Sequence, residues 1–211
     1  MSETVAEILI KIESIKFSFN NHFTLTSGLK SPVYVDCRKI ISFVNERNII
    51  INKMINYFQS NNLNFDLVAG GETAGIPYAG FIAEKINKPM IYVRKKPKGF
   101  GRNQQIEGEF KKNDQAILIE DLATDGGSKI IFIEAMRKNG LKVKDIFVIF
   151  YYDIFDLKSL ALSKLDINIH SLCTWKDIIK VIEKNKIFDK KDIKNLKEFL
   201  SSPDEWRKKN V

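Results

Sequence analysis

The stretch from Ala116 to Lys129 constrains the fold most, because it joins an apolar run, two adjacent acids and a glycine loop. Its first four residues are all apolar, which is typical of a parallel strand buried on both faces. Glu120 and Asp121 follow directly, and an apolar pattern with helical spacing begins at Ile130. The stretch therefore predicts a strand, a loop and a helix in succession, which is the repeating unit of an open α/β sheet.

The loop between the acids and the helix has the composition of a phosphate site. Backbone N–H groups of small residues can converge on an anion there, next to the positive end of the helix. Carboxylates beside such a cradle can accept hydrogen bonds from vicinal hydroxyls. We therefore predict a site for a phosphorylated sugar; the alternative is an ordinary αβ loop with an acidic N-cap. The cradle residues are Thr124, Asp125, Gly126, Gly127 and Ser128.

A second glycine-rich loop follows a predicted buried strand at residues 66–70 and precedes a predicted helix at residues 76–86. Its amides lie where a second anion can bind, because ligands gather at the carboxyl ends of parallel strands. We assign this loop, with Glu72 and Thr73, to a pyrophosphate group. A turn that serves only chain reversal is the alternative.

A cluster of positive charge begins at the end of a predicted strand at residues 90–94. Five cations fall within nine residues and alternate with proline and glycine, and no secondary structure is expected up to Glu109. So long a structureless segment is uncommon unless it is functional, and a mobile cationic loop suits a polyphosphate ligand. A disordered basic surface loop is the alternative. The cations are Arg94, Lys95, Lys96, Lys98 and Arg102.

Composition narrows the class of protein. A chain of 211 residues with 44% apolar content can form one sizeable core, so we expect one domain. The net charge is +8, but residues 171–211 spread 11 basic and 7 acidic residues along amphipathic helices, which argues against nucleic acid as a partner. Neither a membrane span nor a signal peptide is apparent, so a cytoplasmic location is expected. Cys37 and Cys173 lack metal-site spacing and are expected to be buried thiols.

Hydrophobic periodicity supplies the remaining elements. We predict a hairpin over residues 23–36 and place His170 in the core or at the sheet edge, with Trp175 and Trp206 as packing anchors. Further helices are predicted at residues 4–15, 45–60, 157–163, 175–185, 191–201 and 204–209, and further strands at residues 145–152 and 167–172.

The central stretch resembles the 5-phosphoribosyl 1-diphosphate (PRPP) signature of the type I phosphoribosyltransferases, a hydrophobic run, two acids and a Thr-x-Gly-Gly loop. The segment from Phe23 to Tyr34 resembles the N-terminal substrate segment of orotate phosphoribosyltransferases, Phe-Thr-Leu-x-Ser-Gly-x-x-Ser-Pro-x-Tyr. The resemblance spans roughly residues 20–155. It implies an open, mostly parallel sheet flanked by helices. The single domain would comprise a small β/helical hood (about 1–40), a core (about 45–172) and C-terminal helices (about 173–211).

The resemblance also implies an activity, transfer of the phosphoribosyl group from PRPP to orotate with Mg²⁺ as cofactor, in pyrimidine biosynthesis. It implies a homodimer in which the loop at residues 95–109 reaches the neighbouring active site, and no metal ligand from the protein. Lys95, Lys98 and Asp121 are the implied catalytic residues. The implied orotate-binding residues are Thr26, Lys30, Tyr34, Val35 and Thr124. The implied PRPP-binding residues are Glu72, Thr73, Arg94, Lys95, Lys98, Arg102, Glu120, Asp121 and residues 123–128.

Four departures from the family pattern leave alternatives open. The family has Lys at Thr26 and Ala74 and His at Phe100, and an Arg that this chain lacks after the strand at residues 145–152. Arg102 is a candidate replacement for one lost cation. The missing Lys and Arg favour a purine-type phosphoribosyltransferase, which the Phe23–Tyr34 segment opposes. A non-catalytic regulator that senses PRPP or nucleotides is the other alternative, and the retained lysines of the cationic loop argue against it.

Overall fold

The computed structural model describes residues 4–25, 27–97, 105–124, 127–154 and 165–210. The chain forms two compact units. One comprises Val44–Leu172, and the other comprises Met1–Phe43 together with Cys173–Val211.

The unit Val44–Leu172 contains a six-stranded sheet in the order β10-β9-β8-β5-β6-β7. Four of its strands are parallel: β5 (Leu67–Gly71), β6 (Met90–Val93), β8 (Gln115–Ala123) and β9 (Lys142–Tyr151). β7 (Ile106–Glu107) runs antiparallel to β6 at one edge, and β10 (Asn168–Thr174), which runs on into the second unit, forms the other edge. The predicted open, mostly parallel sheet is confirmed.

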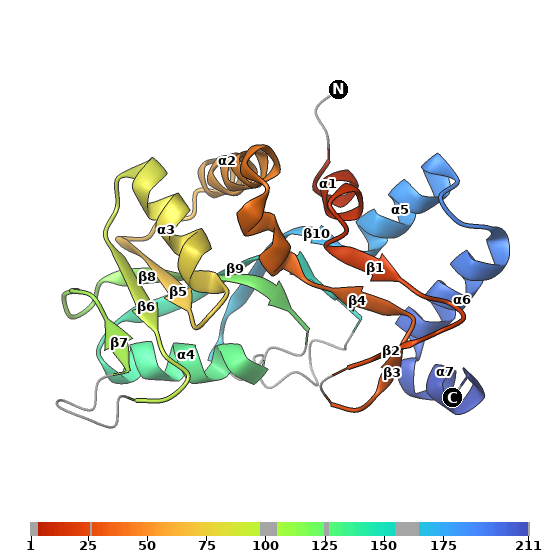
Figure 1. Ribbon diagram of the computed structural model, residues 1–211. Helices are drawn as coiled ribbons and strands as arrows, with labels where there is room; N and C mark the ends of the chain where they lie inside the picture. The colour runs from red at the N-terminus through yellow and green to blue at the C-terminus, as the bar shows by residue number, and fades with distance from the viewer. Residues whose placement is uncertain (1–3, 26, 98–104, 125–126, 155–164, 211) are drawn as a thin grey trace. The chain divides into compact units, whose positions relative to one another are not determined.

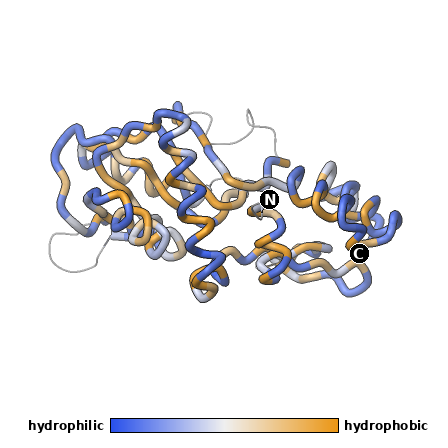
Figure 2. The backbone as a smooth tube through the Cα atoms, turned by 90° about the horizontal axis from the view of Figure 1, so that it is seen from above, coloured by the Kyte–Doolittle hydropathy of each residue, from blue (hydrophilic) through white to orange (hydrophobic). Residues whose placement is uncertain are grey.

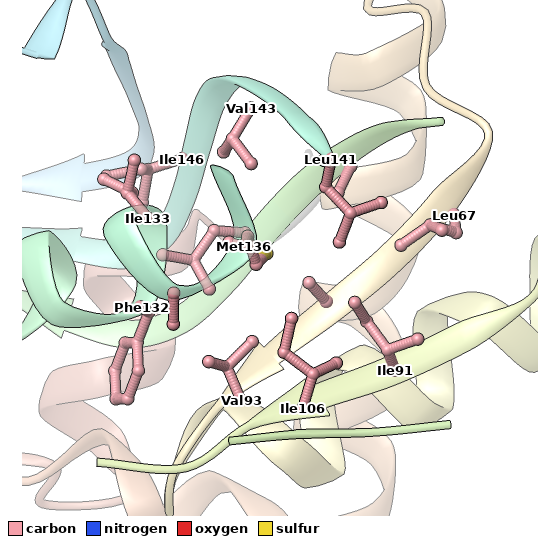
Figure 3. Packing of buried hydrophobic residues seen from close by; sticks show 14 of the residues in the cluster. Leu67, Ile91, Val93, Ile106, Phe132, Ile133, Met136, Leu141, Val143 and Ile146 are labelled. Carbon is pink, nitrogen blue, oxygen red and sulfur yellow. The ribbon is translucent and has the colours of Figure 1, made fainter. Parts of the chain in front are cut away.

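Helices cover both faces of this sheet (Figure 1). α2 (Val44–Ser60) and α3 (Gly75–Ile86) lie on one face, and α4 (Gly127–Lys138) lies on the other. Figure 3 shows how Phe132, Ile133 and Met136 of α4 pack onto apolar side chains of the strands. Their partners include Leu67, Ile91, Val93, Ile106, Val143 and Ile146. Because both faces are covered, the central strands contain continuous buried runs rather than alternating ones: Leu67–Gly71 in β5, Ala116–Glu120 in β8 and Ile146–Tyr151 in β9.

The second unit combines short strands with helices from both ends of the chain. β1 (Ile15–Phe17) pairs antiparallel with β4 (Val33–Val35), and β2 (Phe23–Thr24) pairs antiparallel with β3 (Lys30–Ser31). Its helices are α1 (Val5–Lys11), the 3₁₀ helix η1 (Cys37–Ser42), α5 (Trp175–Asn185), α6 (Lys190–Ser201) and α7 (Pro203–Asn210). The C-terminal helices alternate between hydrophilic and hydrophobic residues (Figure 2), which is the amphipathic pattern that the sequence predicts.

Two sequence predictions about strands need correction. The predicted hairpin at residues 23–36 is limited to β2 and β3, which enclose a turn with Gly28 at φ +81°, while β4 pairs with β1 instead. β1 has three residues, too few for a periodic pattern. The segment after Arg94 is not wholly irregular, because β7 adds to the sheet through Ile106, whose side chain is buried.

Other boundaries differ for local reasons. α1 ends at Lys11 instead of continuing to residue 15, and Glu13 just beyond it has a left-handed backbone with φ +53°. β8 continues through both acids to Ala123, since β9 pairs with it along its whole length. The predicted helix at residues 157–163 lies outside the described residues. Both tryptophans and both cysteines are buried, as predicted. No helix in the described part of the chain is long and apolar enough to cross a membrane.

His170 lies on the edge strand β10, in agreement with its predicted place in the core or at the sheet edge. Its Nε2 is 2.8 Å from Oδ1 of Asp145, and its Nδ1 is 3.2 Å from the hydroxyl of Tyr57. These partners make it part of the packing between β10, β9 and α2.

Candidate active site

The strand register brings three predicted ligand-binding segments to one edge of the sheet. Gly70 of β5 lies opposite Ile119 of β8, and Gly71 lies opposite Val93 of β6. The loop after β5, the acids of β8 and the start of the cationic segment therefore lie side by side at the carboxyl ends of parallel strands. This edge is where open α/β sheets bind ligands.

The two helices that start at this edge have N-termini suited to an anion. The first turns of α3 and α4 contain no acidic residue, and no side chain caps α3 at Ala74. The other α-helices, α1, α2, α5, α6 and α7, each carry an acid in the first turn. A carboxylate normally stabilises the positive helix end, so α3 and α4 leave that role to a ligand.

Close packing requires glycine at both ends of the loop between β5 and α3. A Cβ atom on Gly75 would lie 2.2 Å from the carbonyl oxygen of Ile119, so only glycine lets α3 start against β8. A Cβ atom on Gly71 would lie 2.0 Å from Oε1 of Glu120 and 2.7 Å from the Phe132 ring. The backbone of this loop is therefore pressed directly onto the acidic end of β8.

Glu120 is the most strongly perturbed carboxyl group of the site. The residue is 4% exposed, and its Oε2 lies 3.7 Å from Nζ of Lys129. Burial raises the pKa of Glu120 to about 8; the Lys129 ammonium opposes this shift, and the charge of Asp121 adds to it. At neutral pH the carboxyl group is therefore mostly protonated.

This shift predicts a pH-dependent stability. Between roughly pH 4.5 and pH 8 the folded protein retains the proton on Glu120 and the unfolded chain does not, so the free energy of unfolding falls as pH rises. Each pKa unit corresponds to about 1.4 kcal/mol, so the difference in unfolding free energy between wild type and Glu120→Gln should change by a few kcal/mol. Urea unfolding at pH 5 and pH 9 measures this change. Glu134→Gln, an exposed position on α4, is the control, and parallel pH profiles for Glu120→Gln and wild type would contradict the prediction.

The loop at residues 70–75 is hydrogen-bonded to the start of the cationic segment. Oε2 of Glu72 accepts a hydrogen bond of 2.7 Å from the backbone N–H of Lys95. The N–H of Glu72 donates to the carbonyl of Val93 over 2.9 Å. The Arg94 guanidinium lies 3.8 Å from the Glu107 carboxylate across β6 and β7, whereas the Lys95 side chain is exposed. The backbone of Lys95 is thus fixed by Glu72, while its exposed side chain can reach a ligand.

Six of the remaining predicted PRPP residues lie in the described part of the chain. Asp121 and Thr124 are half-buried, Ala123 is buried, and Thr73, Gly127 and Ser128 are exposed. The carbonyl of Ala123 accepts a hydrogen bond from the N–H of Tyr152, which fixes the end of β8. Five predicted site residues lie outside the described residues: Thr26, Lys98, Arg102, Asp125 and Gly126.

The predicted orotate residues of the second unit lie around the β2–β3 hairpin. Lys30 donates a hydrogen bond from Nζ to the hydroxyl of Thr24 over 2.9 Å, and the Tyr34 ring lies 5.9 Å from the ring of Phe23. The side chain of Val35 is buried, so its contact with a ligand would involve the backbone.

Sequence reasoning missed two residues in these regions. Nε of Arg207 on α7 donates to the carbonyl of Lys30 over 2.9 Å, a contact between residues 177 positions apart that no local pattern reveals. Lys129 is buried beside Glu120. A signal for Lys129 was present, because it precedes Phe132, Ile133 and Met136 by three, four and seven positions, which is the buried face of a helix.

Comparison with known proteins gives a consistent result. No protein-family model matches the chain. The chain is 42% identical over 212 aligned positions to the orotate phosphoribosyltransferase of Roseobacter denitrificans, covering 100% of this chain and 94% of that protein. The orotate phosphoribosyltransferase structure from Aeropyrum pernix aligns with TM-score 0.71 and 25% identity, over 85% of this chain and 99% of that one. The UMP synthase of Leishmania donovani aligns with TM-score 0.76 and 27% identity, over 93% of this chain and 41% of that one.

Identity at this level over the whole chain accompanies a shared fold, and the strand register gathers the PRPP-like motif, the glycine loop and the root of the cationic segment at one edge of the sheet. The chain belongs to the orotate phosphoribosyltransferase family.

Proposed function

We propose that this protein transfers the 5-phosphoribosyl group from PRPP to orotate, which gives orotidine 5′-monophosphate and pyrophosphate for pyrimidine biosynthesis. The observation that carries the proposal is the meeting of the β5 loop, the β8 acids and the α4 N-terminus at one sheet edge. The sequence segment from Phe23 to Tyr34 and the names of the relatives support orotate as the base.

In this reaction orotate N1 forms a bond to C1 of the ribose, and the bond from C1 to the pyrophosphate oxygen breaks. The bonding electrons leave with pyrophosphate, so the enzyme must stabilise a cationic ribosyl centre and a departing polyanion. Lys95 and Lys98 are the proposed cations for the leaving group, together with Arg94 and Arg102. The amides of residues 71–75 and the N-terminus of α3 add to them, and Glu72 and Thr73 belong to this loop.

We propose that the acids of β8 bind the ribose hydroxyls and that the loop after them binds the 5′-phosphate. Glu120 and Asp121 accept hydrogen bonds from the ribose hydroxyls and so orient C1 for attack. The 5′-phosphate binds at Ala123 and the cradle of residues 124–128, where the positive end of α4 faces it. Lys30, Tyr34 and Val35 are proposed to contact orotate, with Thr26 and Thr124.

Magnesium suits this site as an ion that arrives with the substrate. Among the described residues, no three His, Cys, Asp or Glu side chains gather as metal ligands. Mg²⁺ keeps several waters and is readily held by substrate phosphates, so phosphate and hydroxyl oxygens of PRPP are its proposed ligands. When bound, the ion neutralises charge on the leaving pyrophosphate.

Steady-state turnover with PRPP and a panel of bases tests the proposal. We expect turnover with orotate at least roughly 100-fold above that with uracil, adenine or hypoxanthine, because a site built for the orotate carboxylate leaves polar groups unpaired with the other bases. Preferential use of a purine would identify a purine-type enzyme. PRPP binding without turnover of any base would identify a regulator.

We also propose that the protein is a homodimer in which the segment at residues 95–109 contacts PRPP in the neighbouring subunit. Lys95 lies at the start of that segment and its side chain is exposed, which is consistent with contact to a ligand bound in the neighbouring subunit. Sedimentation as a monomer at assay concentration would contradict this arrangement.

A further inference from the structure

The buried pair of Glu120 and Lys129 contains a group that the proposed chemistry does not use. Lys129 stands in the first turn of α4 and is 8% exposed, although it carries a charge. Two energetic costs disfavour a lysine at this position. Burial removes water from its ammonium group, and the positive N-terminal end of α4 repels it. A lysine kept at such a place needs a polar partner, and the carboxyl group of Glu120 at 3.7 Å supplies it.

The contacts of this pair connect both halves of the proposed PRPP site. One carboxylate oxygen of Glu120 is pressed against Gly71 of the pyrophosphate loop, and the other faces Lys129. Nζ of Lys129 also donates a hydrogen bond of 3.2 Å to the hydroxyl oxygen of Ser128 in the phosphate cradle. A hydroxyl that accepts from an ammonium keeps its own proton free to donate to an anion.

From these contacts we propose that Lys129 is a positioning residue for the transfer reaction, holding the Glu120 carboxyl group in a fixed orientation and turning the Ser128 hydroxyl toward the phosphate. The proposal rests on the proposed function, since it assumes that Glu120 accepts from the ribose. Lys129 itself is too buried to be proposed as a ligand of the substrate.

The groups around Glu120 act on its pKa in opposite directions. Asp121 is the next residue along β8, and its charge and side-chain hydrogen bond favour the protonated form of Glu120, as does burial, whereas Lys129 favours the ionised form. Without Lys129, the protonated form of Glu120 would be favoured further, and no cation would fix the orientation of its carboxyl group. The carboxyl group could then turn away from the position in which it accepts from a ribose hydroxyl.

The test compares Lys129→Met, Lys129→Arg, Glu120→Gln and the double variant Glu120→Gln with Lys129→Met. In Lys129→Met we expect the KM for PRPP to rise about tenfold, the size of one charge-assisted contact, with turnover reduced and the KM for orotate within about twofold of wild type. Lys129→Arg should recover most of the loss because it restores the charge. Lys138→Met, an exposed lysine in the last turn of the same helix, should match wild type.

The double variant shows whether Lys129 acts by orienting Glu120 or only by packing in the interior. If Lys129 acts through Glu120, the Lys129→Met change in the Glu120→Gln background should alter the KM for PRPP by less than about twofold. Equal losses in both backgrounds, or an unchanged KM in Lys129→Met, would overturn the proposal. Because the double variant buries no unpaired carboxylate, it remains informative if Lys129→Met fails to fold.

PRPP binding by calorimetry distinguishes failure of this inference from failure of the proposed function. If wild type bound PRPP but used no orotate, the proposed function would be wrong. The same four variants would then decide the role of Lys129, since weaker PRPP binding in Lys129→Met with recovery in Lys129→Arg supports it and equal binding by all four refutes it.

Discussion

Asp121→Asn is expected to lower the turnover number roughly 10- to 100-fold while the fold stays intact. Asparagine has the same size but lacks the negative charge, so it forms a weaker hydrogen bond with a ribose hydroxyl, and a hydrogen bond to a charged group contributes about 1.5 to 3 kcal/mol. Asp121 is half-buried next to Glu120, so solvent replaces the lost contact only in part. Initial rates at saturating PRPP and orotate, together with urea unfolding, measure the two effects separately.

Asp166→Asn is the matched control for this experiment. Asp166 is exposed and has a left-handed backbone with φ +50°, a conformation that asparagine adopts readily. We expect its turnover and stability to equal those of wild type. Near-normal turnover in Asp121→Asn would refute the assignment of this carboxylate to the ribose.

Gly75→Ala should have the largest effect on stability, a loss of about 3 kcal/mol or more. The added Cβ would lie 2.2 Å from the carbonyl oxygen of Ile119. The backbone fixes the position of both atoms, so no side-chain rotation relieves the contact. The start of α3 must then move away from β8. Because the pyrophosphate loop enters α3 at this point, activity should fall with stability.

Gly80→Ala tests whether the close contact, rather than any alanine in α3, causes this loss. Gly80 lies in the same helix, and the nearest atom to an added Cβ would be Sδ of Met90 at 3.8 Å, an ordinary contact. Replacing a helical glycine there should stabilise the protein by about 0.5 to 1 kcal/mol. Urea unfolding of both variants measures the contrast; similar effects of the two substitutions would refute the steric argument.

Hydrophobic periodicity predicted most strands and helices of the unit Val44–Leu172, because the pattern of each element depends only on residues close together in the sequence. The apolar runs of β5, β8 and β9 are typical of strands buried on both faces, and the helical spacing in α2 and α4 marks the faces that pack on them. The resemblance to the phosphoribosyltransferases was local too, carried by the motif around Glu120 and the segment Phe23–Tyr34.

The short strands could not be predicted in this way. β1 has three residues and β7 has two, and neither has enough length to display a period. Their places depend on partners elsewhere, β4 for β1 and β6 for β7, whose pairing becomes favourable only once the chain has folded. The contact between Arg207 and Lys30 depends on the same kind of long-range approach.

The sequence alone determined the kind of sheet, the succession of strand, acids, glycine loop and helix, and the residue types available to bind a phosphorylated sugar. Each of these is set within about fifteen residues by side-chain polarity and backbone freedom. The tertiary structure decided the register that brings Gly71 against Glu120, and it placed Lys129 beside that carboxylate. Those features set the charge state of Glu120, because burial and the distances between charges exist only when separate segments of the chain pack together.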